Sequence, residues 1–209
     1  TSGATFSVLD REMMLDKIKA VKDTIEGDLP NIYLLHGDFE DTEMNDLYNH
    51  PKVKAHINLT HGEGFGRPLL EASISQKPVI ASNWSGHIDF LHKDLAILLP
   101  GSLQNVERGS VPDDFMVDGS QWFTVNYQQA SATMKDVYKK YKKYTLNAKK
   151  LGVINKSKFS LDAMTRELGK ILDKYVPEFP KEVKLELPKL KKVGSTELPK
   201  IKLPKLKKV

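Results

Sequence analysis

Residues 55–71, AHINLTHGEGFGRPLLE, place a run of apolar and β-branched residues directly before a glycine-rich turn. The run over residues 55–60 predicts a strand that is buried on both faces. Pro68 predicts that a helix follows over residues 68–76, because proline is favoured at the first helical position, where its missing N–H would have no partner. The sequence therefore predicts the order strand, turn, helix.

The turn itself combines three glycines with two carboxylates. Gly62, Gly64 and Gly66 omit the side chains that would keep a ligand from the backbone, so the unpaired N–H groups at the helix start can point at a phosphate. Glu63 and Glu71 lie on either side of these N–H groups. Carboxylates repel phosphate but accept strong hydrogen bonds from the vicinal hydroxyls of ribose and hexoses. The pattern is typical of a site for a ligand that alternates sugar, diphosphate and sugar.

This stretch resembles the E-x7-E motif of the retaining glycosyltransferases of the GT-B class, glycosyl transferases group 1, which are built from two Rossmann-like domains. The similarity continues through residues 77–82 and the Trp84-Ser-Gly86 loop, and it covers residues 31–99 more faintly. The family carries a Glu three positions after a glycine of this loop, where this chain has the shorter Asp89.

The resemblance implies a role for each residue of the motif. Glu63 would position the donor sugar and is the predicted catalytic residue. The backbone of Gly64, Phe65 and Gly66 would hold the diphosphate, and Glu71 would hold the ribose hydroxyls. The Phe65 ring has a second interpretation, as an aromatic plug for the core.

Four further residues complete the predicted donor contacts. Arg67 is adjacent to the phosphate position, although a surface arginine at a helix start is an equal alternative, and Leu70 lies within the motif. His36 and Gly37 follow a predicted strand, where the family contacts the nucleotide base through backbone groups. A plain turn between strand and loop explains these last two residues equally well.

Strands and helices alternate along the first half of the chain, which predicts right-handed crossovers and a parallel sheet. The expected strands are residues 31–36, 55–60, 78–82 and 96–99, and the expected helices are residues 10–25 with Asp10 as N-cap, 41–49 and 68–76. The predicted fold class is α/β, a Rossmann-like doubly wound parallel sheet that forms the C-terminal half of a GT-B fold. Ligands of such sheets bind at the carboxyl ends of the strands. Residues 36–37, 61–66 and 83–86 fall at these ends.

The remainder predicts C-terminal helices and a tail. Residues 102–121 predict a long irregular segment, and residues 127–150 and 160–175 predict helices. We expect residues 1–176 to form the nucleotide-sugar-binding domain. Residues 177–209 form a repetitive tail rich in proline and lysine.

The tail carries the positive charge of the chain. Ten Lys and three Glu lie in residues 181–209, which leaves 22 basic and 24 acidic residues elsewhere, although the whole chain has a net charge of +5. A nearly neutral body argues against a nucleic-acid partner. The simplest interpretation of the tail is an extended solvated terminus, and a sharper hypothesis is weak contact with anionic membranes.

Composition limits the remaining classes. The chain has no cysteine, which excludes disulfides and thiol catalysis and favours a cytoplasmic location. The spacing of His61, His87 and His92 around Asp89 matches no zinc site, so we expect no metal and no cofactor beyond a UDP- or GDP-sugar donor. Because the chain has 209 residues and begins at Thr1, we expect it to be the C-terminal part of a longer enzyme whose acceptor domain lies upstream.

Two alternatives differ in class. A dinucleotide-dependent oxidoreductase needs Gly-x-Gly-x-x-Gly and an acid after the next strand, whereas here the third glycine comes one residue early and the strand ends in Ser82 and Asn83. A nucleotide-sugar-binding or structural module without activity stays open, since fold does not fix function. The predicted function is hexosyl transfer with retention from a nucleoside diphosphate sugar.

Overall fold

A computed structural model describes residues 6–107, 109–110 and 117–177. The chain divides into two units, Thr1–Leu168 and Gly169–Val209, and this boundary falls inside helix α6 (Leu161–Tyr175). The described part of the second unit is the end of α6 and the two residues after it. The predicted tail, residues 177–209, lies outside the described residues except for its first position.

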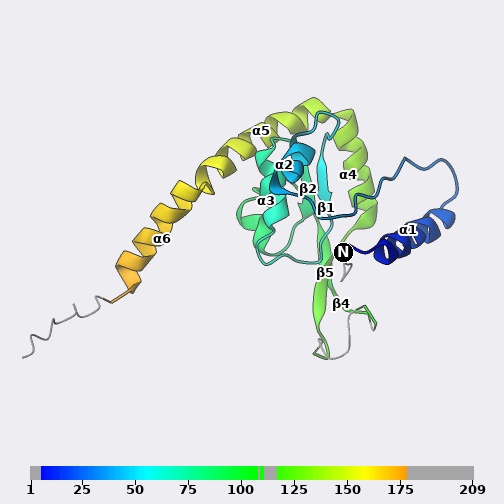
Figure 1. Ribbon diagram of the computed structural model, residues 1–209, viewed down its shortest axis with the longest axis horizontal. Helices are drawn as coiled ribbons and strands as arrows, with labels where there is room; N and C mark the ends of the chain where they lie inside the picture. Colours follow the sequence, from blue (N-terminus) through cyan, green and yellow to red (C-terminus); the bar gives the residue numbers. More distant parts are fainter. Residues whose placement is uncertain (1–5, 108, 111–116, 178–209) are drawn as a thin grey trace, which may run out of the picture. The chain divides into compact units, whose positions relative to one another are not determined.

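The first unit contains a parallel sheet of three short strands in the order β1-β2-β3 (Figure 1). The strands are β1 (His56–Asn58), β2 (Val79–Ser82) and β3 (Ile97–Leu99). In the register, Ile57 lies beside Ile80, and Ile80 lies beside Ile97. The prediction of an α/β fold with a parallel sheet is confirmed, and the architecture is compatible with a Rossmann-like fold.

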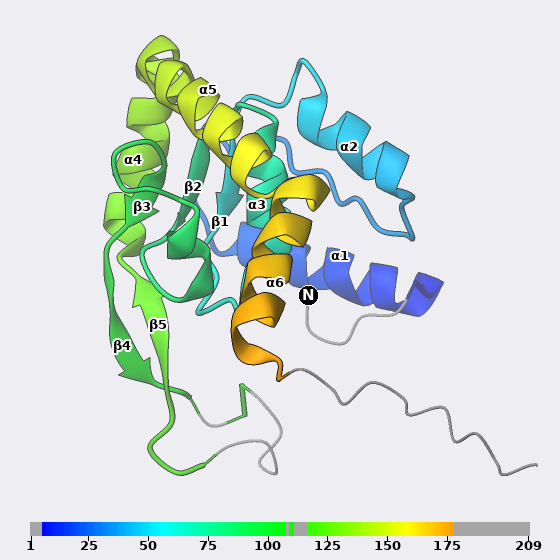
Figure 2. The same ribbon diagram turned by 90° about the vertical axis from the view of Figure 1, so that its left-hand side faces the viewer.

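Alternate residues of β2 supply the two hydrophobic cores of this unit. Val79 and Ala81 belong to a cluster with residues of α3 (Arg67–Ile74) and α5 (Tyr141–Lys158). Ile80 belongs to a second cluster with β5 (Gln121–Val125) and α4 (Tyr127–Lys139). Side chains of a strand alternate between its faces, and Figures 1 and 2 show α3 and α5 on one side of the sheet and α4 on the other. All four residues of β2 are therefore buried.

A β-hairpin follows the sheet where the sequence predicted an irregular segment. β4 (Gly101–Asn105) pairs antiparallel with β5, and Gly101 lies opposite Val125. The prediction for residues 102–121 is therefore wrong at both ends. The partner strands are far apart along the chain and β4 is exposed along its whole length, so no alternation of apolar and polar residues marked it.

Helices α1 (Val8–Asp23) and α2 (Asp41–Asn49) precede the sheet. The N-cap of α1 is Ser7, whose Oγ accepts a hydrogen bond from the Asp10 N–H at 3.1 Å, so the prediction of Asp10 as N-cap is wrong. α2 begins where predicted and has an acidic capping box, in which the Glu40 N–H donates to Glu43 Oε2 at 2.9 Å.

The predicted strand over residues 31–36 is absent, and this prediction is wrong. The segment has no regular structure, and Ile32, Tyr33 and Leu35 are exposed. A strand needs a neighbour for its backbone hydrogen bonds, and no described strand pairs with this segment. The prediction that the strand at residues 55–60 is buried on both faces is also wrong. β1 is an edge strand with one neighbour, and its Ile57 is 47% exposed.

The other predicted elements are present with shifted ends. Residues 127–150 form two helices rather than one, because the backbone leaves the helical region at Lys140, with φ −112° and ψ 30°. α3 begins at Arg67, so Pro68 is its second residue, and α6 agrees with its predicted range. No helix in the described part of the chain is both long enough and apolar enough to span a bilayer.

Candidate functional site

The glycine turn lies between β1 and α3, in the predicted order of strand, turn and helix. Gly66 is the N-cap of α3 and has φ +85°, a left-handed conformation that favours glycine. A Cβ at Gly66 would also lie 3.0 Å from the Cβ of His87, which is fully buried below the turn. Only a residue without a side chain fits at Gly66, and this allows α3 to begin there.

The loop after β2 packs directly on this turn. The Glu63 N–H donates to Ser85 Oγ at 2.6 Å, and the Gly86 N–H donates to the Glu63 carbonyl oxygen at 2.9 Å. A Cβ at Gly86 would overlap the carbonyl oxygen of Gly64, and Ser85 holds the unusual φ of +70°. The structure thus brings together two of the three segments predicted at the carboxyl ends of the strands.

Several backbone N–H groups of the turn have no partner among the described residues; Gly64 and Phe65 are exposed, whereas Gly66 is buried. Leu69 and Leu70 donate their N–H groups to the Gly66 carbonyl. The N–H groups of Gly64, Phe65 and Gly66 make no hydrogen bond with any described residue. Together with the positive end of the α3 dipole, they form a place where an anion would be stabilised.

The two carboxylates of the motif have different surroundings. Glu63 is partly buried, and its Cβ would lie 3.5 Å from a Cβ placed at Gly66, so its side chain starts beside the turn. Glu71, one helical turn into α3, forms an ion pair in which Arg67 Nε lies 3.2 Å from Oε1. The Arg67 side chain is 82% exposed and the Glu71 side chain is 42% exposed, so this ion pair lies at the surface of α3.

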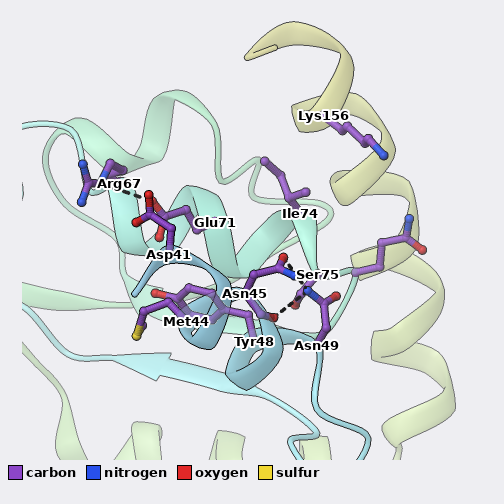
Figure 3. A pocket seen from close by; sticks show the side chains of 11 residues that line it. Asp41, Met44, Asn45, Tyr48, Asn49, Arg67, Glu71, Ile74, Ser75 and Lys156 are labelled. Atoms are coloured by element: carbon purple, nitrogen blue, oxygen red, sulfur yellow. Dashed lines mark hydrogen bonds and ion pairs between the residues drawn. The ribbon is translucent and has the colours of Figure 1, made fainter. Parts of the chain in front are cut away.

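Glu71 and Arg67 also line a pocket of about 700 Å³ between α2, α3 and α5. In Figure 3 they lie close to Asp41 of α2. Partial burial of Tyr48 of α2, assisted by the charge of Glu71, raises the pKa of its hydroxyl above the ordinary value. The remaining lining residues are Met44, Asn45, Asn49, Ile74, Ser75, Gln76 and Lys156. The pocket gives Glu71 a partly enclosed, polar environment.

Lys77 holds the C-terminal end of α2, which forms one wall of this pocket. Its Nζ donates to the carbonyl oxygens of Tyr48 at 2.6 Å and of His50 at 2.7 Å, at the C-terminal end of α2. Burial lowers the pKa of Lys77, and burial together with Lys77 lowers the pKa of the neighbouring His56. His56 Nε2 lies 3.2 Å from Ser75 Oγ, so the same group of residues links α2, β1 and α3.

Two predicted donor contacts have side chains that support the core. The ring of Phe65 lies 5.2 Å from that of buried Phe90 and 6.0 Å from that of Phe159, yet 45% of Phe65 is exposed. Leu70 belongs to the cluster that packs α3 on the sheet. The Phe65 ring therefore packs on the core, which was the second interpretation of this residue. Its backbone forms part of the turn.

The third predicted segment, His36 and Gly37, lies between α1 and α2 in the part of the chain that forms no strand. Gly37 has φ +154°, which allows the chain to turn there. Contact of these two residues with a nucleotide base stays a prediction.

An aromatic group beside the turn was not predicted from the sequence. Trp122 of β5 stacks on His61, with ring centroids 4.1 Å apart and an angle of 4° between the ring planes. Trp84 stacks on Phe123 at 5.7 Å and 5°. Trp84 was noted within its loop, but Trp122 comes 56 residues after Gly66 and belongs to no motif.

The histidines of the site are hydrogen-bonded to backbone. His61 Nδ1 lies 2.7 Å from the Phe123 carbonyl oxygen, and His87 Nε2 lies 2.6 Å from the Ser82 carbonyl oxygen. Within residues 6–107, 109–110 and 117–177, no group of three or more His, Cys, Asp or Glu side chains is arranged to hold a metal ion.

No protein-family model matches this sequence, and no curated protein is significantly similar to it. Function must therefore be argued from the geometry of the turn, the two carboxylates and the pocket.

Proposed function

We propose that this chain is the donor-binding part of a retaining GT-B glycosyltransferase, which transfers a hexosyl unit from a nucleoside diphosphate sugar to an acceptor. One observation carries the proposal. The N–H groups of Gly64, Phe65 and Gly66, which have no partner among the described residues, come just before α3, between Glu63 and Glu71 in the sequence.

The diphosphate is the group that these N–H groups would bind. Transfer of the sugar leaves negative charge on the nucleoside diphosphate, and fixed N–H dipoles stabilise that charge without having to reorganise. The dipole of α3 acts in the same direction. Leaving-group stabilisation by the turn is thus the catalytic contribution of this chain, and it needs no metal ion.

Glu71 is assigned to the ribose. Arg67 pairs with Oε1, which leaves the second carboxylate oxygen of a partly exposed side chain to accept hydrogen bonds from vicinal hydroxyls. Arg67 holds the carboxylate in place and adds positive charge beside the diphosphate. The pocket next to Glu71 offers space for the nucleoside.

Glu63 is assigned to the donor sugar. Its backbone is held by Ser85 and Gly86 from the loop after β2, so the start of its side chain has a fixed direction. The carboxylate can accept hydrogen bonds from the sugar hydroxyls while the turn binds the diphosphate. Glu63 and Glu71 would then hold the two ends of one donor molecule.

The finer fold assignment belongs to the same proposal. A doubly wound sheet needs further strands beyond β1. A GT-B enzyme closes a second domain over the donor to bring the acceptor. Alone, this chain should bind donor weakly and transfer little or no sugar.

Calorimetric titration with UDP, GDP, UDP-glucose and GDP-mannose tests the proposal. Glu71→Ala should weaken binding of the preferred nucleotide by roughly 10- to 100-fold, the loss expected for charge-assisted hydrogen bonds. Asp46→Ala, which removes an exposed carboxylate of α2, is the matched control and should bind like the wild type. Binding that Glu71→Ala leaves unchanged would contradict the ribose assignment, and failure of every nucleotide to bind would contradict the function.

A further inference from the structure

Helix α5 carries positive charge that is not balanced within the helix. Its 18 residues include six lysines and no aspartate or glutamate. Lys142, Lys149 and Lys150 are exposed, and they form no ion pair with any residue that the structure describes. The positive charge of the folded body is therefore concentrated on this helix.

The helices packed on α5 do not neutralise it. Asp136 is the one acidic residue of α4, and it already has two partners, since Lys140 Nζ lies 2.7 Å from its Oδ1 and the Tyr144 hydroxyl donates to its Oδ2 at 2.6 Å. Glu71 is the one acidic residue of α3, and it pairs with Arg67. Neither carboxylate is left to pair with the lysines of α5.

Packing determines which face of α5 points outward. The buried residues of the helix are Ala148, Leu151, Gly152 and Asn155. A Cβ at Gly152 would lie 2.9 Å from the Ser73 carbonyl oxygen, so α5 lies directly against α3, as Figure 2 shows. The opposite face is therefore turned to solvent on a helix that the core holds in place.

This outward face combines apolar side chains with lysines. Leu146 is 64% exposed and Val153 is 61% exposed. They are seven positions apart, about two helical turns, so they form one row along the helix. Two pairs of lysines with the same spacing flank this row on either side. We call this surface the basic face of α5; it consists of Leu146, Val153, Lys142, Lys143, Lys149 and Lys150.

Exposed apolar side chains between rows of lysine suit the interface of an anionic bilayer. The apolar side chains enter the boundary between headgroups and acyl chains, while the lysine stems lie along it and their ammonium groups reach the lipid phosphates. A nucleic acid would bind the charge but gain nothing from Leu146 and Val153. We propose that the basic face of α5 docks this chain on a membrane surface that contains anionic lipids.

The proposal goes beyond the proposed function and does not depend on it. No residue of the basic face lines the pocket beside Glu71. The lysines in the sequence of the tail would add attraction to the same lipids, as about one favourable interaction for each lysine near the surface. The basic face would determine which side of the first unit meets the membrane.

Vesicle co-sedimentation of the full chain tests the proposal. The chain should bind vesicles of phosphatidylcholine mixed with phosphatidylglycerol, should not bind phosphatidylcholine alone, and should be released by salt. Removing two lysines by Lys149→Gln with Lys150→Gln should weaken binding at least about tenfold, since each lysine near an anionic surface contributes roughly fivefold. Lys17→Gln with Lys22→Gln, which removes two exposed lysines of α1, is the matched control and should change binding less than about twofold.

Two further variants test the apolar row. Leu146→Ser should weaken vesicle binding about fivefold without lowering the melting temperature, because this side chain is exposed in the free chain. Since the chain has no cysteine, Val153→Cys accepts a single environment-sensitive fluorophore. Its emission should shift to shorter wavelength when anionic vesicles are added, whereas the same label at Lys17→Cys should not respond.

The outcomes separate the basic face from other sources of binding. Absence of binding to anionic vesicles overturns the proposal. Equal losses in the α5 and α1 pairs, or binding that leaves the label at position 153 unchanged, would assign the contact to overall charge or to the tail and overturn it too. Tighter binding of poly(U) than of vesicles, unaffected by Leu146→Ser, would indicate a nucleic-acid partner instead.

Discussion

Two segments of this chain, β2 and residues 31–36, both contain several apolar residues but have opposite environments. β2 lies between two strands and between two hydrophobic clusters, and all of its residues are buried. Residues 31–36 pair with no described strand, and Ile32, Tyr33 and Leu35 remain exposed. An apolar run thus predicts a strand only where the fold provides a neighbour for its backbone and a surface for both faces.

A matched pair of substitutions tests this difference in packing, and it should give the largest change in stability. Ile80→Ala removes a side chain that is 2% exposed and should lower the free energy of unfolding by about 2–5 kcal/mol. Ile32→Ala, at a residue that is 52% exposed, should change it by less than about 0.5 kcal/mol. Urea unfolding followed by circular dichroism measures both. Equal losses would show that residues 31–36 are packed in solution.

The glycine turn is also tightly packed, because the loop after β2 lies against it. The substitution Gly86→Ala tests this packing. The new Cβ would overlap the Gly64 carbonyl and lie 2.9 Å from the Glu63 carbonyl oxygen, so the backbone must move at a cost of about 1–3 kcal/mol. Gly64→Ala is the control, since a Cβ there has no heavy atom within 4 Å and should leave stability nearly unchanged. Similar melting temperatures for both variants would contradict the close approach of the two loops.

Asn155 links α5 by hydrogen bonds to α3 and to the loop after β2, and its substitution should change stability somewhat less. It is fully buried, and its Nδ2 donates to Ser73 Oγ at 2.8 Å and to the Phe90 carbonyl oxygen at 3.2 Å. Asn155→Ala leaves that carbonyl without its donor and should cost about 1–2 kcal/mol. Asn147→Ala removes an exposed hydrogen bond to the Asp94 carbonyl and should cost less. The reverse order in thermal denaturation would contradict the buried link.

The smallest predicted effect is a pH dependence from His56. Burial, with a contribution from Lys77, lowers its pKa in the folded state below 6.5, so the unfolded chain binds more protons in this range. Stability should therefore rise with pH up to and through 6.5 and fall as the pH decreases below that value. His56→Gln should reduce this slope between pH 5 and 7 in urea titrations, whereas His92→Gln, at an exposed position, should keep it. An unchanged slope in His56→Gln would contradict the assignment.

Local signals predicted the parts of this molecule that depend on a few adjacent residues. The glycine turn, the start of α3 and the acidic cap of α2 all follow from backbone geometry within about four residues. The cap of α1 was misplaced, because Ser7 competed with Asp10 over one helical turn. The strand over residues 78–82 was predicted, and β2 is found at residues 79–82.

Features that depend on distant partners were not predictable. The β4-β5 hairpin and the stacking of Trp122 on His61 join residues far apart in the sequence. Whether residues 31–36 would pair depended on which strands were present to receive them. The motif thus predicted which residues form the turn, whereas the residues around it had to come from the structure.

Backbone NMR of the full chain tests the central claim most directly, because an amide resonance reports on each N–H group of the turn. Addition of the nucleotide preferred in calorimetry, UDP or GDP, should shift the amide resonances of Gly64, Phe65 and Gly66 with the same saturation curve. Glu71→Ala should shift that curve to higher nucleotide concentration. Saturable shifts confined to other parts of the chain, with these three amides unchanged, would contradict the assignment of the turn as the diphosphate site.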